Sequence, residues 1–144
     1  QHPSMKSDLA RVAVVYHQGG IYLDTDFEPR KTLDPIIAQG MDAFIVPQGW
    51  EPACAVFGSV PNSLWMELCR EAAISYAWSG GPWAPVTYYQ IALRYGVPIL
   101  DTDLFYPYKW WERAERKHEA FPNAIGIHRH GGSWCGGTPD LPKE

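Results

Sequence analysis

The sequence lacks three features that would assign it to a particular class of protein. No apolar run approaches the roughly 18–20 residues of a membrane span, and no signal peptide is visible. Lys and Arg number 12 against 16 Asp and Glu, which gives a net charge of −4. Nucleic-acid-binding proteins carry a basic face, so this balance argues against that class. The cysteines are three in number, so they cannot complete a disulfide framework within the chain.

The cysteines also match no zinc-binding spacing, because Cys54, Cys69 and Cys135 lie far apart. We expect free thiols that are mostly buried. Cys135 lies in a Gly-rich segment beside candidate site residues, so it is the cysteine most relevant to function.

The sequence does contain enough apolar residues for a folded core. They make up 46% of 144 residues, so we expect one domain over residues 1–144. Seven Trp and eight Tyr are many for this length. Aromatic rings are common in carbohydrate sites because sugar C–H faces stack on them, whereas a Trp-rich core explains the same composition.

Short apolar strands alternate with helical patterns along the chain, which is typical of an α/β layered domain. The first helix begins after an expected N-cap at Ser7 and ends at Gly19-Gly20. A strand at 21–23 then leads into Asp24-Thr25-Asp26. Charges of both signs over 112–119 indicate a solvated helix face. Further helices are expected at 61–76 and 87–95, and further strands at 43–46, 53–57, 97–100 and 124–128.

Asp24 and Asp26 are candidate metal ligands because two carboxylates at a strand end can address one hard cation. Mg²⁺ or Mn²⁺ suits such oxygen ligands, and water and diphosphate oxygens would complete its shell. The ion would neutralise a leaving diphosphate as a Lewis acid. The alternative is an Asx-turn with a surface carboxylate. A second copy, Asp101-Thr102-Asp103, shows that the tripeptide alone is weak evidence.

A longer pattern separates the two copies. Ser7-Asp8-x-x-Arg11 and then Gly19-Gly20-Ile21-Tyr22-x-Asp24-x-Asp26 resemble the DxD sugar-binding region of a glycosyltransferase family. That family contains Och-type α-mannosyltransferases and α-1,4-galactosyltransferases, and the large clostridial glucosylating toxins share its core. The likeness continues through residues 53–70, Gly81-Pro82, Phe105-Tyr106-Pro107 and a closing segment at 124–134.

The resemblance implies a fold, and it indicates which parts of that fold this chain contains. We expect a GT-A-like (Rossmann-like) mixed sheet flanked by helices. Family members usually carry a first strand and helix before Ser-Asp-x-x-Arg, and these supply much of the nucleotide pocket. This chain begins almost at the motif, so either it is an N-terminally truncated domain or it holds the base poorly.

The resemblance also implies roles for individual residues. Without it, Asp8 and Arg11 would be an exposed ion pair worth well under about 1 kcal/mol, Tyr22 a core residue and His128 a satisfied structural histidine. The implied assignments are catalytic and metal-binding for Asp24 and Asp26, metal-binding for His128, donor-sugar-binding for Asp8, Arg11, Tyr22 and Gly20, and diphosphate-binding for Ser133 and Trp134.

The closing segment departs from the family pattern at two positions. Arg129 stands where the family has its second His, and His130 takes the place of an aromatic residue. We expect Arg129 to add positive charge against a diphosphate.

The expected activity is that of a metal-dependent retaining glycosyltransferase (a hexosyltransferase). It would move a sugar from a UDP- or GDP-sugar to a hydroxyl acceptor on a glycan, lipid or protein, with Mn²⁺ or Mg²⁺ as cofactor and no nucleic-acid partner. For a bacterial source we expect the cytoplasm or the membrane surface. The first rival is a non-catalytic sugar- or metal-binding module. The second is a haloacid-dehalogenase-like phosphatase, disfavoured because Phe27-Glu28-Pro29 follows the motif and no later Asp-Asp pair occurs.

Overall fold

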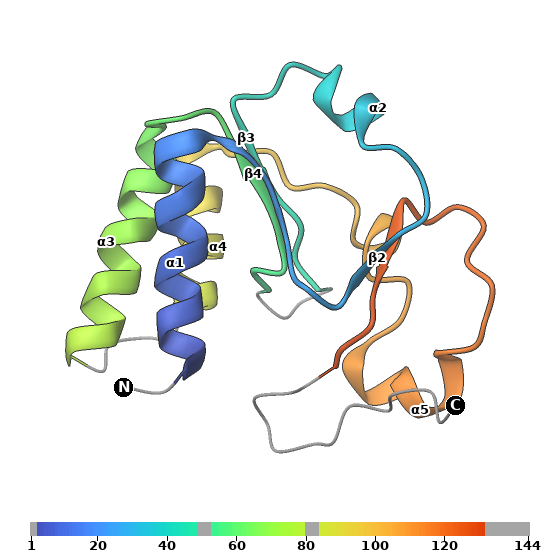
Figure 1. Cartoon of the computed structure of the whole chain (residues 1–144). Coiled ribbons are helices and arrows are strands. Elements are labelled where there is room, and N and C mark those ends of the chain that lie inside the picture. The colour runs from blue at the N-terminus through green and yellow to red at the C-terminus, as the bar shows by residue number, and fades with distance from the viewer. Residues whose placement is uncertain (1–2, 49–52, 80–83, 132–144) are drawn as a thin grey trace.

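Three helices pack on one face of a small sheet in the computed structural model of the chain (Figure 1). They are α1 (Pro3–Gln18), α3 (Leu64–Ser79) and α4 (Ala84–Tyr95), and α3 packs against both of the others. This layered arrangement confirms the α/β class. The structure describes residues 3–48, 53–79 and 84–131.

The sheet under these helices has the strand order β1-β4-β3. β1 (Gly20–Leu23) and β3 (Ala43–Ile45) both pair antiparallel with β4 (Val56–Ser59). Its strands therefore contain no parallel pair, although a mixed sheet was expected. The described residues contribute one parallel bridge, between Ile45 and Ile99.

That bridge is what remains of the strand predicted at 97–100. Ile45 N donates to Pro98 O at 3.1 Å, and Leu100 N donates to Ile45 O at 3.0 Å. Pro98 has no N–H with which to extend a ladder, and the chain turns into η1 (Thr102–Leu104) directly afterwards. The parallel pairing is therefore limited to a single position.

A second, two-stranded sheet lies beside the first. In it β2 (Phe27–Pro29) pairs antiparallel with β5 (Gly126–His128), with Phe27 opposite His128. The described residues of the connections form short helical turns, which are α2 (Asp34–Ile37), η1, η2 (Trp110–Glu112) and α5 (Arg113–Arg116).

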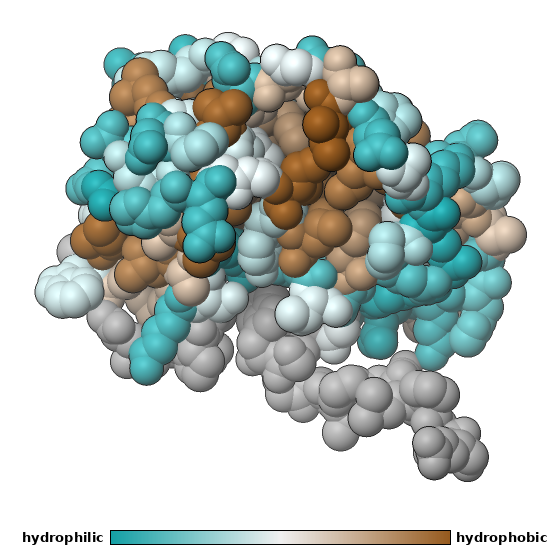
Figure 2. Space-filling view, turned by 45° about the horizontal axis from the view of Figure 1, so that its top comes forward, coloured by the Kyte–Doolittle hydropathy of each residue, from teal (hydrophilic) through white to brown (hydrophobic). Residues whose placement is uncertain are grey.

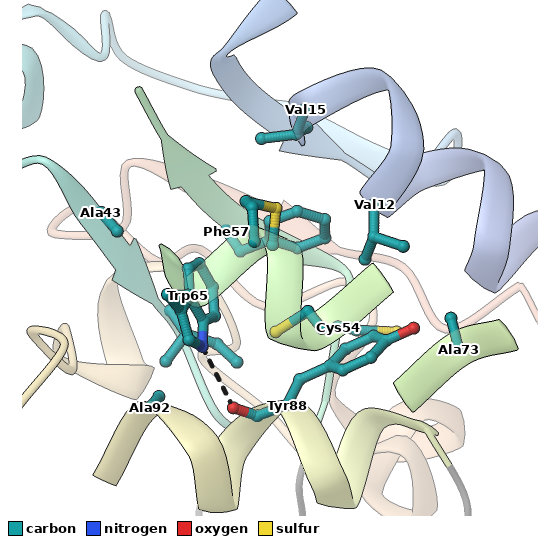
Figure 3. Packing of buried hydrophobic residues seen from close by; sticks show 12 residues of the cluster. Val12, Val15, Ala43, Cys54, Phe57, Trp65, Ala73, Tyr88 and Ala92 are labelled. Atoms are coloured by element: carbon teal, nitrogen blue, oxygen red, sulfur yellow. Dashed lines mark hydrogen bonds between the residues drawn. The ribbon is translucent and has the colours of Figure 1, made fainter. Parts of the chain in front are cut away.

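The three-stranded sheet is covered on both faces. Successive side chains of a strand point to opposite sides, so neighbouring residues enter different cores. Ala43 and Ile45 of β3 contribute to the core beneath the helices, whereas Phe44 and Val46 contribute to a second core. Figure 3 shows the first of these cores, in which the indole N–H of Trp65 donates to a backbone carbonyl at 3.3 Å. Burial on both faces explains why these strands read as continuous apolar runs.

Element boundaries differ from the predictions at several ends. α1 begins at Pro3, so Ser7 lies inside the helix and is not its N-cap. The predicted stop at Gly19 is confirmed, because its N–H donates to Val15 O at 2.9 Å and its φ of +69° is left-handed. The strand predicted at 53–57 is displaced to β4. The charged segment 112–119 forms only the short α5 and the end of η2.

Gly126 allows the two strands of the second sheet to approach closely. A Cβ at this position would lie 2.1 Å from Cζ of Phe27, a distance that no real contact permits. Phe27 is itself packed against Phe105 in the second core. A glycine at 126 therefore determines how close β5, and with it His128, lies to the turn that precedes β2.

One surface groove lies at the opposite end of β1 from the Asp-Thr-Asp turn. It has a volume of about 160 Å³, and apolar side chains gather around it (Figure 2). The groove is lined by Gly20, Ile21, Ile36, Ile37, Met41, Phe44, Gly58, Ser59 and Val60.

None of the described helices is long and apolar enough to cross a membrane.

Candidate functional site

Asp24 and Asp26 lie on the tight turn that joins the two sheets. Asp24 N donates to Ala55 O at 2.9 Å, which continues the β1–β4 pairing by one residue. Phe27 N then donates to Asp24 O at 2.9 Å and closes the turn. Asp26 is anchored from the other sheet, because its backbone carbonyl accepts from Arg129 N at 2.9 Å. The backbone of the two aspartates is thus held by hydrogen bonds, to Ala55 on one side and to Arg129 on the other.

His128 comes from the far end of the chain to the same place. The β2–β5 register places it opposite Phe27, directly after the turn. Its Nε2 lies 3.0 Å from Asp26 Oδ1 and 3.6 Å from Asp24 Oδ2. One ligand atom from each of the three residues lies within 4.8 Å of the others. The structure therefore brings together the three predicted metal ligands.

The chemistry of this donor set fits a divalent cation. Two carboxylates suit Mg²⁺ or Mn²⁺, and an imidazole nitrogen makes the set somewhat softer, which favours Mn²⁺. His128 Nε2 is buried and not aligned for a hydrogen bond with any described residue, despite its closeness to Asp26. Gly131 N donates to Asp26 Oδ2 at 2.6 Å and leaves Oδ1 to face His128. A possible Asp24/Asp26/His128 metal site is thus present.

The two carboxylates and the imidazole each favour the charged form of the other. Burial alone would raise the pKa of Asp26, but the adjacent His128 and the Gly131 N–H bring it down to about 2. Burial likewise opposes ionisation of Asp24, whose pKa is nevertheless held below its ordinary value by His128, Arg11 and Tyr22. Burial would lower the pKa of His128, but the two carboxylates raise it to about 9. Both acids are therefore ionised at neutral pH, as metal ligands must be, whereas His128 carries a proton that a bound metal ion would displace from Nε2.

Arg11 and Tyr22 hold the other side of Asp24. Asp24 Oδ1 accepts from Arg11 Nη1 at 2.9 Å and from the Tyr22 hydroxyl at 2.7 Å. The guanidinium carbon of Arg11 lies 4.9 Å from the centre of the Tyr22 ring. Because Oδ1 is occupied in this way, Oδ2 is the oxygen of Asp24 that faces His128.

Asp8 completes this network from the first helix. Its Oδ1 lies 3.3 Å from Arg11 Nη2, and only 7% of the residue is exposed. The alternative of an exposed ion pair is therefore wrong. Burial raises the pKa of Asp8, and the charge of Arg11 only partly opposes that effect. A buried acid beside a cation is typical of a functional site, although structural networks show it too.

Cys54 contacts this network of side chains, which the sequence did not predict. Its backbone carbonyl accepts from Arg11 Nη1 at 3.1 Å, and its thiol lies 3.8 Å from Asp8 Oδ1. Cys54 and Cys69 are buried free thiols, as predicted. No sequence signal could identify a backbone acceptor, because every residue carries one. Cys135, the cysteine singled out from the sequence, lies outside the described residues.

The two departures from the family pattern have different surroundings. Arg129 is engaged by Glu28, with Nε 2.7 Å from Oε2, and its Nη1 donates to Lys117 O at 2.9 Å. These contacts link the residue after β5 to β2 and occupy the guanidinium that was expected to face a diphosphate. His130 contacts His128 and packs against Tyr106, and burial together with the charge of His128 lowers the pKa of His130 to about 4.

The second Asp-x-Asp copy has the structure of a local turn. Asp101 caps η1 by accepting from Asp103 N at 3.0 Å, and both residues are exposed. No metal cluster in the described part of the chain includes them. Among the described residues, only the first copy therefore lies beside a third group that could share a cation with it.

Of the other predicted site residues, Gly20 lies away from the cluster. It is at the opposite end of β1, beside the apolar groove. Ser133 and Trp134 lie outside the described residues, as does most of the expected loop at 79–83.

A comparison with known proteins finds a match in the part of the chain that carries the two aspartates. Residues 1–41 match the family described as glycosyltransferase sugar-binding region containing DXD motif. That segment contains Asp8, Arg11, Asp24 and Asp26, and it ends well before His128. No curated protein and no solved structure matches the chain. The match suggests a glycosyltransferase-like role, and it is confined to residues 1–41.

Proposed function

We propose that the chain is the catalytic domain of a metal-dependent retaining glycosyltransferase with a GT-A-like arrangement. The observation that carries the proposal is the convergence of Asp24, Asp26 and His128 on one point. Two of these residues lie in the segment that matches a sugar-binding family. The donor would be a UDP- or GDP-sugar and the acceptor a hydroxyl group of a glycan, lipid or protein.

The residues divide into two groups in this proposal. Asp24, Asp26 and His128 would hold Mn²⁺ or Mg²⁺, which when bound supplies positive charge to the leaving diphosphate. Asp8 and Arg11 would line the adjoining donor-sugar site, where a carboxylate accepts from sugar hydroxyls and a guanidinium donates to sugar or phosphate oxygens. Their burial supports this assignment, because Arg11 contacts both Asp8 and the proposed metal ligand Asp24.

Arg11 also has a role in positioning Asp24. Its Nη1 bonds to Oδ1 of Asp24 and so leaves Oδ2 toward His128. Tyr22 supports the same oxygen with its hydroxyl. We assign Arg11 and Tyr22 to positioning Asp24 as well as to lining the donor site. Gly20 has no role in the proposal, because it lies at the other end of β1.

The test is a donor screen with matched variants. The protein is incubated with Mn²⁺ and a panel of UDP- and GDP-sugars, and donor binding, hydrolysis and transfer are followed. Asp24→Asn/Asp26→Asn should abolish all metal-dependent turnover. Asp101→Asn/Asp103→Asn removes two carboxylates of the same sequence pattern and should leave turnover unchanged, because Asn can still cap η1.

Other outcomes would contradict the proposal. Binding of glycans that needs no metal, without donor hydrolysis, would identify a non-catalytic sugar-binding module. Release of phosphate from simple monoesters by wild type would instead identify a phosphatase that uses Asp24 as nucleophile.

A further inference from the structure

Only one nitrogen of His128 faces the carboxylates, and the other is engaged behind it. His128 Nδ1 lies 2.9 Å from Nδ1 of His130. His130 Nε2 in turn lies 3.2 Å from the backbone carbonyl oxygen of Tyr108. A continuous chain of contacts thus runs from a main-chain carbonyl, through two imidazoles, to the candidate metal ligands.

The hydrogen positions along this chain follow from its fixed end. A carbonyl oxygen can only accept, so Nε2 of His130 must carry the hydrogen in the contact with Tyr108. A neutral imidazole has one N–H, so His130 Nδ1 then presents a lone pair. His128 must donate to that lone pair from Nδ1. Nε2, the nitrogen that faces Asp24 and Asp26, is then the His128 nitrogen that can give up its proton to a metal ion. The neutral form that binds the ion keeps its hydrogen on Nδ1 and has its lone pair on Nε2.

We propose that His130 is a positioning residue, which sets the tautomer and the ring orientation of His128 so that Nε2 is available to a divalent ion. Metal-binding histidines commonly donate their second ring N–H to an acceptor that fixes the tautomer. Here that acceptor is another imidazole, itself oriented by the Tyr108 carbonyl. The inference rests on the proposed function in one respect, namely that the three ligands bind a metal.

The surroundings of His130 restrict its ring. The ring is stacked with Tyr106 at a centroid distance of 6.4 Å and an interplanar angle of 26°, and meets Tyr108 edge-on at 5.4 Å. It meets the His128 ring at 4.5 Å with an interplanar angle of 80°. Its backbone φ is +52°, in the left-handed region that few non-glycine residues occupy. Such a conformation persists where neighbouring contacts over-determine it, often at functional sites.

Two substitutions separate the acceptor from the ring. His130→Phe keeps an aromatic ring against Tyr106 and Tyr108 but removes both nitrogens. His130→Asn keeps an acceptor near the place of Nδ1, and Asn tolerates positive φ. We expect His130→Phe to weaken Mn²⁺ binding by about 10–100-fold, as measured by calorimetry. His130→Asn should recover most of that loss. Circular dichroism and the thermal midpoint will show that both variants are folded.

A spectroscopic measurement tests the tautomer directly. In metal-free wild type with ¹⁵N-labelled histidine, long-range ¹H–¹⁵N spectra should show the His130 hydrogen on Nε2. A hydrogen on Nδ1 of His130, or on both of its nitrogens at neutral pH, would overturn the inference. So would equal Mn²⁺ affinity in wild type and folded His130→Phe, or equal losses in the Phe and Asn variants.

The two measurements also distinguish this inference from the proposed function. If wild type binds Mn²⁺ and His130→Phe binds it equally well, only the role of His130 is wrong. If wild type binds no Mn²⁺, the proposed metal site is wrong, and the role of His130 falls with it even where the tautomer is as stated.

Discussion

Arg11 connects two acids through one guanidinium, which is the main feature of the site at the scale of single residues. Nη1 bonds to Asp24 and Nη2 lies beside Asp8, and the Arg11 side chain is only 10% exposed. Burial by itself would lower the pKa of Arg11, but its acidic and polar neighbours raise it, so the residue stays charged. The cation and the two acids therefore have different energetic roles, and their removal should have different effects.

Arg11→Met should lower the free energy of unfolding by about 3 kcal/mol, because removing one partner of a buried ion pair leaves the other charges uncompensated. Urea unfolding followed by circular dichroism measures this change. Arg94 is exposed on α4, so Arg94→Met serves as the control and should change stability by less than about 0.5 kcal/mol. Equal stability of Arg11→Met and wild type would contradict a structural role of the guanidinium.

Asp8→Asn should behave in the opposite way. The folded protein raises the pKa of Asp8 above its ordinary value of 3.8, mainly through burial. Ionised Asp8 therefore costs folding free energy, a cost that is absent below pH 3.8 and grows as the pH rises through the folded pKa. We expect Asp8→Asn to be at least as stable as wild type at pH 7 but to bind the donor sugar more weakly.

The stability difference between Asp8→Asn and wild type should shrink toward pH 4. Urea unfolding of both proteins at pH 7 and pH 4 measures this. A variant that is clearly less stable than wild type at pH 7 would show that the Arg11 ion pair outweighs the burial of Asp8.

At the scale of elements, the site depends on how two short strands approach each other. β5 presents His128 opposite the start of β2, and Arg129 bonds to Glu28 across the same pair. Gly126 permits that approach, since a Cβ there would enter the ring of Phe27. The position of His128 relative to the two aspartates thus depends on a three-residue ladder and one glycine.

Gly126→Ala should push β5 away from β2. We expect a loss of about 1–3 kcal/mol of stability, as for other overpacked cores, together with weaker Mn²⁺ binding because His128 moves with its strand. Ile127→Val on the same strand is the matched control, since it costs about 1 kcal/mol through lost packing without altering the approach to Phe27. Equal Mn²⁺ affinities in the two variants would show that the spacing of β2 and β5 does not determine the site.

At the scale of the whole molecule, the candidate metal site joins parts of the chain that are far apart in sequence. The Asp-Thr-Asp turn follows the first strand, whereas His128 ends the last strand of the described residues. A bound cation would bind the folded protein and have little affinity for the unfolded chain, in which these ligands are separated. Binding should therefore stabilise the fold as a whole.

Mn²⁺ should raise the thermal midpoint of wild type, and excess EDTA should reverse the shift. At 100 times the dissociation constant the expected stabilisation is about 2.7 kcal/mol. Differential scanning fluorimetry measures it. Asp101→Asn/Asp103→Asn should show the same shift as wild type, whereas Asp24→Asn/Asp26→Asn should show none. A shift that persists in the latter variant would place the bound ion elsewhere.

The sequence alone determined the features that depend on neighbouring residues. Apolar spacing and Gly19 predicted the first helix and its end, and the short apolar run before Asp24 predicted β1. These patterns are legible because helix caps, left-handed glycines and strand alternation are local requirements of the backbone. The boundaries were less accurate, since Ser7 lies inside α1 and the predicted strand at 97–100 is a single bridge.

Only the tertiary structure decided which polar groups meet. The pairing of Arg11 with Asp24, the acceptor role of the Cys54 carbonyl and the contact of His130 with His128 join segments whose proximity depends on packing. Arg129, expected to meet a diphosphate, pairs with Glu28 for the same reason. A sequence pattern can name a carboxylate or an imidazole. The partner that orients that group is set by the burial of the helices against one sheet and by the close approach of the strands of the other.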